Sequence, residues 1–142
     1  MTLYECTGMN ESALAIGIGC DRGVLLTTIE TALDRALVLC NRERRQIAVL
    51  ASIDLKRDEI ALQDLARVHG WPLQFYPAQA LAQVVVPNPS ETVRHYTGTP
   101  AVAEAAALLA AGATASDLLI EKFKLKGEDG RNVTISIARM RN

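Results

Sequence analysis

Two short and nearly unbroken apolar runs, residues 13–18 and 47–51, stand on either side of a segment with helical periodicity. Such runs are typical of strands buried on both faces of a sheet, although periodicity alone does not separate them from buried helix. Between them, apolar residues recur every three or four positions over 26–40, and Thr27 with Glu30 has the spacing of a capping box. The pattern predicts a strand, a helix and a second strand, joined as a right-handed βαβ unit.

Shorter elements are expected in the middle of the chain. Residues 57–69 predict a second helix, because their apolar positions share one face and Gly70 suits the position just after a helix end. A short strand is expected over 71–75. Pro77 is placed to begin a brief helix that ends at Ala82.

The clearest helix of the chain is expected over 101–111, a stretch rich in alanine, the best helix former. Thr99 precedes it as a good N-cap, Pro100 fits its first position, and Gly112 suits its end. The preceding residues 87–90 combine proline, asparagine and serine and predict a loop.

The end of the chain has the pattern of a hairpin. Residues 118–126 and 132–138 flank the turn-forming stretch 127–130, and the second of these segments alternates apolar with polar side chains. We therefore expect a single α/β domain over 13–142, with a mixed, mostly parallel sheet flanked by helices and a C-terminal antiparallel hairpin. Residues 1–12 are polar and aperiodic, and we expect a leader there.

Composition and charge exclude several classes of protein. Fifteen lysines and arginines against sixteen acidic residues give a net charge of −1, whereas a general nucleic-acid binder shows a strong basic excess. The longest apolar stretch, 101–113, contains Glu104 and is shorter than the roughly 20 residues of a membrane span. Three cysteines without C-x-x-C spacing and two histidines without ligand spacing indicate neither a disulfide framework nor a metal site. We expect a cytoplasmic protein with no nucleic-acid or membrane partner and no cofactor.

The first candidate site is the glycine-rich segment 17–23, directly after the first expected strand. Gly19 allows a ligand close to the backbone, and Arg22 has the fork geometry that binds a carboxylate or phosphate. The alternative is a tight turn with no ligand, and the spacing matches neither a dinucleotide nor a Walker A motif. Cys20 has no histidine placed beside it by the sequence, so we interpret it as a small apolar side chain rather than a nucleophile.

The second candidate site follows the second expected strand. Ser52, Asp54 and Lys56 bring a hydroxyl, an acid and a cation to the same sheet edge, if the two strands are parallel neighbours. Asp58 and Glu59 fit better as acids at the start of the next helix, where they suit its dipole.

The third candidate site surrounds the alanine-rich helix. Glu104 is the only charge between residues 100 and 115, on a segment otherwise suited to burial, and a buried carboxylate is a site candidate. The alternative is that it lies on an exposed helix face. Lys122, in the first hairpin strand, is the lysine placed to reach a ligand or to pair with Glu104, and Ser90 and Gly98 lie in the loop before the helix.

Six segments, taken in order, carry a resemblance to a known family: G-I-G-C-D-R-G (17–23), A-S-I-D-L-K-R-D-E (51–59), N-P-S-E-T-V (88–93), G-T-P-A-V-A-E-A-A-A-L (98–108), L-L-I-E-K-F-K (118–124) and N-V-T-I-S-I-A-R (132–139). Their order and spacing resemble the family formed by CobE and the C-terminal domain of CbiG, which are cobalamin-biosynthesis proteins. The resemblance extends over residues 13–139, and Ser52 stands where the family often has threonine.

The resemblance implies an α/β domain that acts on a corrin-ring intermediate, a precorrin or hydrogenobyrinic-acid-like molecule, in the aerobic pathway together with other enzymes of that pathway. Two hypotheses follow: an accessory or carrier protein that binds the intermediate, or a hydrolase that opens a precorrin lactone and releases acetaldehyde, as CbiG does. No N-terminal CbiG domain is found in the sequence, which favours binding. Carried over by motif, the ligand-facing positions are Gly19, Cys20, Arg22, Asp54, Lys56, Glu59, Ser90, Gly98, Glu104 and Lys122.

Overall fold

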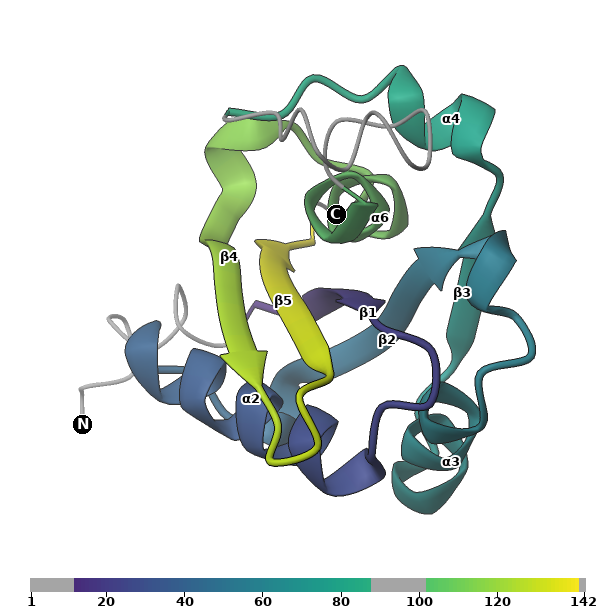
Figure 1. The fold of residues 1–142 in the computed structure, drawn as a ribbon. Helices are drawn as coiled ribbons and strands as arrows, with labels where there is room; N and C mark the ends of the chain where they lie inside the picture. Colours follow the sequence, from purple (N-terminus) through teal and green to yellow (C-terminus); the bar gives the residue numbers. More distant parts are fainter. Residues whose placement is uncertain (1–11, 88–101, 141–142) are drawn as a thin grey trace, which may run out of the picture.

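Five strands form one mixed sheet in the order β3-β2-β1-β5-β4. The computed structural model describes residues 12–87 and 102–140 (Figure 1). The strands, in chain order, are β1 (Leu14–Cys20), β2 (Ile47–Ile53), β3 (Leu73–Tyr76), β4 (Leu118–Lys126) and β5 (Asn132–Arg139). Strands β1, β2 and β3 are parallel to one another, whereas β5 is antiparallel to both β1 and β4. This arrangement confirms the expected single α/β domain with a C-terminal hairpin.

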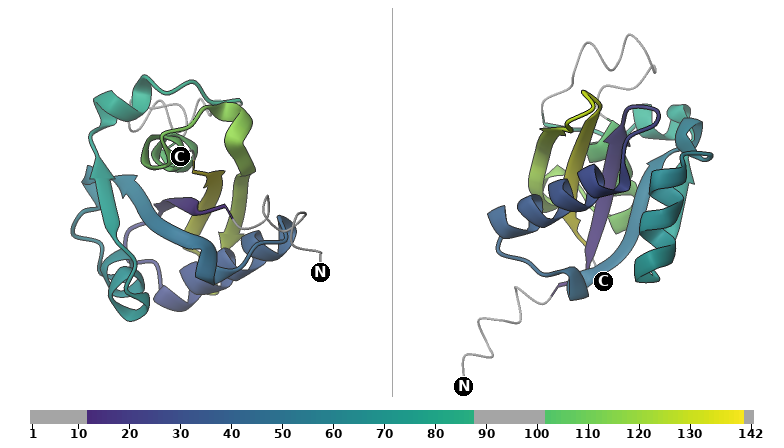
Figure 2. Two further views of the ribbon diagram at one scale, coloured as in Figure 1. Left: turned by 180° about the vertical axis from the view of Figure 1, so that it is seen from behind. Right: turned by 60° about the horizontal axis from the view of Figure 1, so that its bottom comes forward.

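Helices cover both faces of the sheet. Within the described residues they are α2 (Leu26–Leu39), α3 (Ile60–His69), α4 (Ala78–Ala82) and α6 (Val102–Ala111). Figure 1 shows α2 and α3 below the sheet and α6 with α4 above it, and the two views of Figure 2 show the same layers from behind and from below. The chain thus forms three layers around a central sheet.

Most expected helix ends are confirmed, whereas the expected capping box of α2 and the expected start of α3 are wrong. Gly70 and Gly112 follow α3 and α6 with φ of 71° and 64°, a left-handed conformation that glycine adopts without a steric cost. Helix α2 begins at Leu26 with no side-chain cap, so Thr27 lies inside it and forms no capping box with Glu30. Helix α3 begins at Ile60 rather than at residue 57.

The short 3-10 helix Asp54–Lys56 explains the later start of α3. It turns the chain immediately after β2, and the amide of Glu59 donates to the carbonyl of Lys56 before α3 begins. The expected strand over 71–75 is displaced in a similar way to Leu73–Tyr76, since Trp71 still bonds to the end of α3 through its amide and the carbonyl of Ala66. The expected brief helix is confirmed as α4, with Pro77 in the N-cap position.

The core has large side chains on one face of the sheet and small ones on the other. Leu14, Ile16 and Ile18 of β1 are fully buried in the same cluster as the apolar face of α2. On the opposite face, α6 packs with its alanines against Ala15, Ala51 and Ala138. Gly17 lies so close to α6 that a Cβ atom on it would stand 1.8 Å from the carbonyl oxygen of Ala103. Only glycine fits at this position because the helix backbone rests directly on the sheet.

Candidate functional site

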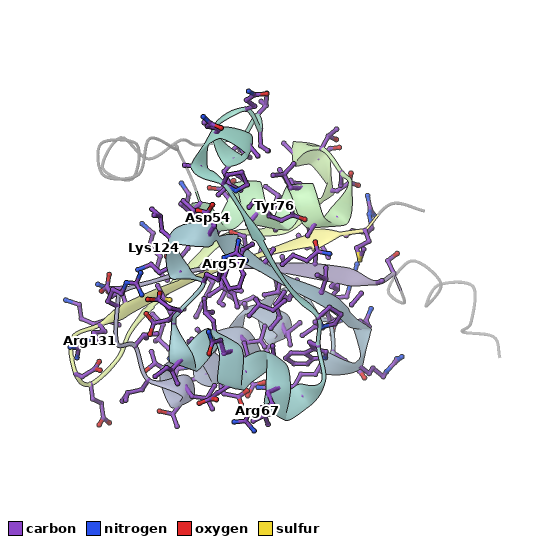
Figure 3. The ribbon with its side chains drawn as sticks, turned by 90° about the vertical axis from the view of Figure 1, so that its right-hand side faces the viewer. Asp54, Arg57, Arg67, Tyr76, Lys124 and Arg131 are labelled. Carbon is purple, nitrogen blue, oxygen red and sulfur yellow. The ribbon has the colours of Figure 1, made fainter. Side chains whose placement is uncertain are left out.

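The candidate site lies at the edge of the sheet where the parallel strands end. Strands β1, β2 and β3 end at Cys20, Ile53 and Tyr76, and β4 runs in the same direction because both β1 and β4 are antiparallel to β5. Ligands of open α/β sheets bind at such an edge. Figure 3 shows Asp54, Arg57 and Lys124 toward this side of the molecule.

Side chains of the first and second candidate segments connect the loops that follow β1 and β2. The guanidinium of Arg22 donates to the Asp58 carboxylate at 2.5 Å and to the carbonyl of Leu55. The amide of Gly23 donates to Glu59 Oε2 at 3.2 Å, and Glu59 is only 6% exposed. The Arg22 guanidinium also lowers the pKa of the Asp58 carboxyl group. Asp58 and Glu59 therefore hold the loop after β1, and the fork of Arg22 is engaged within the chain. Glu59 stands at the N-cap position of α3, as expected for an acid at the helix start, but its side chain forms no cap bond there.

Two further polar contacts at this edge are structural. The Ser52 hydroxyl is fully buried and donates to the carbonyl of Ile18 at 2.6 Å, so it does not face a ligand. Arg131, from the hairpin turn, donates through Nε to the carbonyl of Arg22 at 2.8 Å. No local pattern predicts this contact of Arg131, because its partner lies 109 positions earlier in the chain.

Cys20, at the end of β1, has the properties of a buried thiol. Burial raises its pKa to about 11, and the nearby Lys56 ammonium opposes that rise without cancelling it. A thiol with such a pKa is protonated near neutral pH, and the thiolate is the nucleophilic form. This agrees with the interpretation of Cys20 as a small apolar side chain.

Asp54 and Lys56 stand at the end of β2 without fixed partners. Within the described residues, the side chains of both make neither a hydrogen bond nor an ion pair, and both are partly exposed. They differ in this from Arg22 and Glu59, whose polar groups are engaged within the chain. Lys56 and Asp54 are therefore available to a ligand at this edge.

The third candidate segment contains the most unusual polar group of the described structure. Glu104, in the first turn of α6, is 0% exposed, and neither of its carboxylate oxygens makes a hydrogen bond to any described residue. Lys122 Nζ lies 3.4 Å from Glu104 Oε1, with 23% of the lysine side chain exposed. Burial raises the pKa of Glu104, whereas the Lys122 ammonium acts in the opposite direction. The expected burial of Glu104 and its expected pairing with Lys122 are confirmed, and the alternative of an exposed helix face is wrong.

An irregularity in β4 determines where Lys122 points. Ile120 pairs with Ile137 and Phe123 with Ile135, so three steps along β4 match two along β5. The additional residue lies at Glu121 and Lys122, where the Ser136 hydroxyl donates to the carbonyl of Glu121 at 2.6 Å. A bulge of this kind re-aims side chains. Regular alternation alone did not predict the bulge or the role of Ser136.

Gly19 presents bare backbone at the strand-end edge. It lies on the same face of β1 as Gly17, but a Cβ atom on it would meet only the Cβ atom of Thr134, at 4.0 Å. Among residues 12–87 and 102–140, no atom fills the space over Gly19 as α6 fills the space over Gly17. The structure pairs Glu104 with Lys122 and places Gly19 near the end of β1 and Lys56 just after β2. Ser90 and Gly98, with Thr99 and Pro100, lie outside the described residues.

Residues 12–87 and 102–140 contain neither a metal-binding cluster nor a membrane-spanning helix. No group of three or more histidine, cysteine or acidic side chains there is arranged to hold a metal ion. No helix in that part of the chain is long and apolar enough to cross a bilayer.

Comparisons with known proteins agree with this geometry. The family model described as "Cobalamin synthesis G C-terminus" matches residues 14–138. A cobalt-precorrin-5A hydrolase of Priestia megaterium is 38% identical over 88% of this chain, which spans only 32% of that relative. A protein CobE of Sinorhizobium sp is 34% identical over 79% of this chain and 73% of its own length.

Solved structures with the same fold come from the same pathway. A crystal structure of CobE, from the cobalamin (vitamin B12) biosynthetic pathway, has a TM-score of 0.74 and 32% identity, with 92% of each chain covered. The cobalamin biosynthesis protein chiG of Agrobacterium tumefaciens has a TM-score of 0.62 and 26% identity, with 92% of this chain and 100% of that chain covered. On this evidence the chain belongs to the CbiG C-terminal domain family of cobalamin-biosynthesis proteins and is a CobE-like member of it.

Proposed function

We propose that this protein binds a precorrin-type tetrapyrrole intermediate at the edge where β1, β2 and β4 end, and that it acts as an accessory or carrier protein of cobalamin biosynthesis. The observation that carries the proposal is the buried Glu104 beside Lys122, on the face of the sheet to which the bare backbone of Gly19 also belongs. The name of the Priestia megaterium relative, a cobalt-precorrin-5A hydrolase, supports a ligand of this class.

The chemistry of the edge suits such a ligand. A precorrin is an apolar macrocycle that carries carboxylate side arms, so its site requires cations, hydrogen-bonding groups and a flat surface without side chains. Lys56, in the 3-10 helix after β2, and Lys122, in β4, supply cations, and no described residue covers Gly19, so a ring can approach the sheet there. Glu104 has no hydrogen bond within the described residues, so a ligand group that donates to it, or accepts from its protonated form, would satisfy a buried polar atom.

The runner-up is a hydrolase that opens a precorrin lactone. The observation that favours it is the raised pKa of Glu104, since a carboxyl group that titrates nearer to neutral pH is suited to take a proton from an attacking water molecule. In this scheme Glu104 is the general base that takes a proton from water as the water oxygen bonds to the lactone carbonyl, and Lys122 stabilises the charge that develops nearby. The acyl C–O bond of the lactone then breaks, and the proton passes to the leaving ring oxygen. The chain spans about a third of the relative that carries the hydrolase name.

The test combines two measurements on the purified protein. Visible absorption is titrated with metal-free corrinoid acids, and released acetaldehyde is assayed with a lactone-bearing precorrin. We expect a saturable spectral shift near one equivalent without acetaldehyde. Acetaldehyde release would establish the hydrolase instead, and the absence of a shift with every corrinoid would contradict both hypotheses.

Two variants place the ligand on the structure. Glu104→Gln keeps the shape of the side chain and removes its charge, and Glu43→Gln, on an exposed side chain in the turn before β2, is the matched control. A carrier that uses Glu104 loses roughly tenfold in corrinoid affinity in the first variant and none in the second, since a hydrogen bond to a charged group contributes about 1.5 kcal/mol or more. A hydrolase that uses Glu104 as base keeps its affinity and loses turnover.

A further inference from the structure

An open groove of about 490 Å³ lies on the other face of the sheet, between the first turns of α2 and the β4–β5 hairpin. Figure 1 shows the hairpin turn reaching α2 at the bottom of the molecule. The groove is lined mainly by polar side chains and by the hairpin turn: Leu25, Thr27, Thr28, Thr31, Arg35, Leu125, Lys126, Gly127 and Glu128. None of these residues belongs to the site proposed above, since that site lies on the face covered by α6.

Hydrogen-bond donors without acceptors gather at one end of the groove. Helix α2 has 14 residues, no side-chain cap and no acidic residue in its first turn. The amides of Leu26 and Thr27 make no hydrogen bond to a described residue, whereas those of Thr28 and Ile29 donate to the carbonyl of Leu25. The free amides and the positive end of the helix dipole favour a negative charge at this place.

Thr28 provides an independent observation that a ligand belongs there. Its side chain lines the groove and is only 7% exposed, yet its hydroxyl makes no hydrogen bond to any described residue. Thr31, one turn later, donates instead to the carbonyl of Thr27 at 2.9 Å, which is the usual partner of a helical threonine. Gly127 packs directly on Thr28, because a Cβ atom there would stand 2.6 Å from the Thr28 hydroxyl oxygen. The backbone of the hairpin thus holds this hydroxyl at the groove wall.

The charged side chains that line the groove also favour a negatively charged ligand. Arg35 and Lys126 form no ion pair within 4 Å among residues 12–87 and 102–140, and Glu128 is the only acidic side chain on the walls. An acceptor-only ligand satisfies the amides, the hydroxyl and the two cations together.

We propose that this groove binds an oxyanion, a phosphate or carboxylate group of a small molecule, held by the amides of Leu26 and Thr27, the Thr28 hydroxyl, Lys126 and Arg35. The site is separate from the corrinoid site, so it stands or falls independently of the proposed function.

The experiment titrates the full-length, 15N-labelled protein with inorganic phosphate and, in a second series, with citrate, at constant ionic strength. Backbone amide signals of Leu26, Thr27 and Gly127 are followed by NMR, with sodium chloride as the blank. We expect saturable shifts of these amides, and the series that saturates at the lower concentration identifies phosphate or carboxylate as the preferred group. Shifts that are absent, or that sodium chloride reproduces, would overturn the proposal.

Three variants locate the anion. Thr28→Val keeps the side-chain shape and removes the hydroxyl, Arg35→Gln removes a groove cation, and Arg67→Gln, on the exposed face of α3, is the matched control. We expect the first two to weaken anion binding about threefold each, and the control to leave it unchanged. If Thr28→Val does not fold, the comparison of anion binding between Arg35→Gln and Arg67→Gln tests the proposal by itself. Equal effects of those two substitutions would show only general charge screening and would refute the site.

Discussion

The two faces of the sheet differ in the size of their side chains, and therefore in how closely the covering helices pack against the strands. The face under α2 and α3 carries large aliphatic residues such as Ile16, Leu50 and Ile137, all fully buried. The face under α6 carries Ala15, Gly17 and other small residues, and packs against a helix made largely of alanine. Small residues let backbones approach, and on that face the helix reaches van der Waals contact with the strand itself.

This difference determines where charge is buried. On the face with large side chains, the buried cluster under α2 and α3 consists of aliphatic side chains such as Ile16, Leu33 and Ile137. On the face with small ones, α6 lies low enough for Glu104 to meet Lys122 of β4 at 3.4 Å. One face therefore stabilises the fold, and the other, at its strand-end edge, combines packing with a polar site. The three predictions below test this division.

The largest effect is expected from Gly17→Ala. The new methyl group would overlap the carbonyl oxygen of Ala103, so α6 has to move away from the sheet, and the loss of unfolding free energy should exceed about 3 kcal/mol. Gly19→Ala, two residues later on the same face, is the matched control and should cost less than about 1 kcal/mol. Urea unfolding followed by circular dichroism measures both. Similar losses in the two variants would show that α6 does not rest on β1 as described.

A second comparison uses neighbouring residues of β5 that face opposite sides of the sheet. Ile137→Ala leaves a cavity among large side chains and should cost about 3 kcal/mol. Ser136→Ala removes the hydroxyl that donates to Glu121 and should cost about 1 kcal/mol. Because Ser136 holds the bulge that aims Lys122, the serine variant should also weaken corrinoid binding. Unfolding curves measure the effect on stability, and the absorption titration measures the effect on corrinoid affinity. An unchanged affinity of Ser136→Ala would show that the bulge does not contribute to ligand binding.

The smallest effect is a change in the pH dependence of stability. The pKa of Glu104 is raised above its ordinary value of 4.5 in the folded protein, so the folded state holds this proton more tightly than the unfolded chain. The associated stability is fully present below that ordinary value and is lost as the pH rises through the raised pKa. Glu104→Gln has no such loss, so its stability relative to the unaltered protein should increase with pH above 4.5.

The check is urea unfolding of both proteins at several pH values, with Glu43→Gln as the exposed control. The control difference should stay constant with pH. A constant difference for Glu104→Gln as well would mean that the carboxyl group is not desolvated. Lys122→Met should enlarge the loss at high pH, because the ammonium group that opposes the rise in pKa is then absent.

Much of the fold could be predicted from local patterns. The strands β1 and β2, the helix between them, the C-terminal hairpin and the glycines after α3 and α6 all follow from periodicity and backbone preference. The capping box of α2 and the start of α3 were predicted wrongly, because the polar residues near them have tertiary partners: Glu30 pairs with Arg44 and His69, and Glu59 binds the Gly23 amide. Such tertiary partners engage the side chains that a local capping pattern assigns to the helix start, and the pattern itself does not reveal them.

The sequence by itself determined the α/β class, the single charge in the alanine-rich helix and the family. It also placed Glu104 and Lys122 among the candidates, because a lone carboxylate on an apolar segment and a lysine on a strand are local features. Only the tertiary structure decided that Arg22 is engaged within the chain, that the bulge in β4 turns Lys122 toward Glu104, and that Gly17 is covered whereas Gly19 is open. The physical reason is that these outcomes depend on register and on the distance between layers, and both are fixed by contacts between residues far apart in the chain.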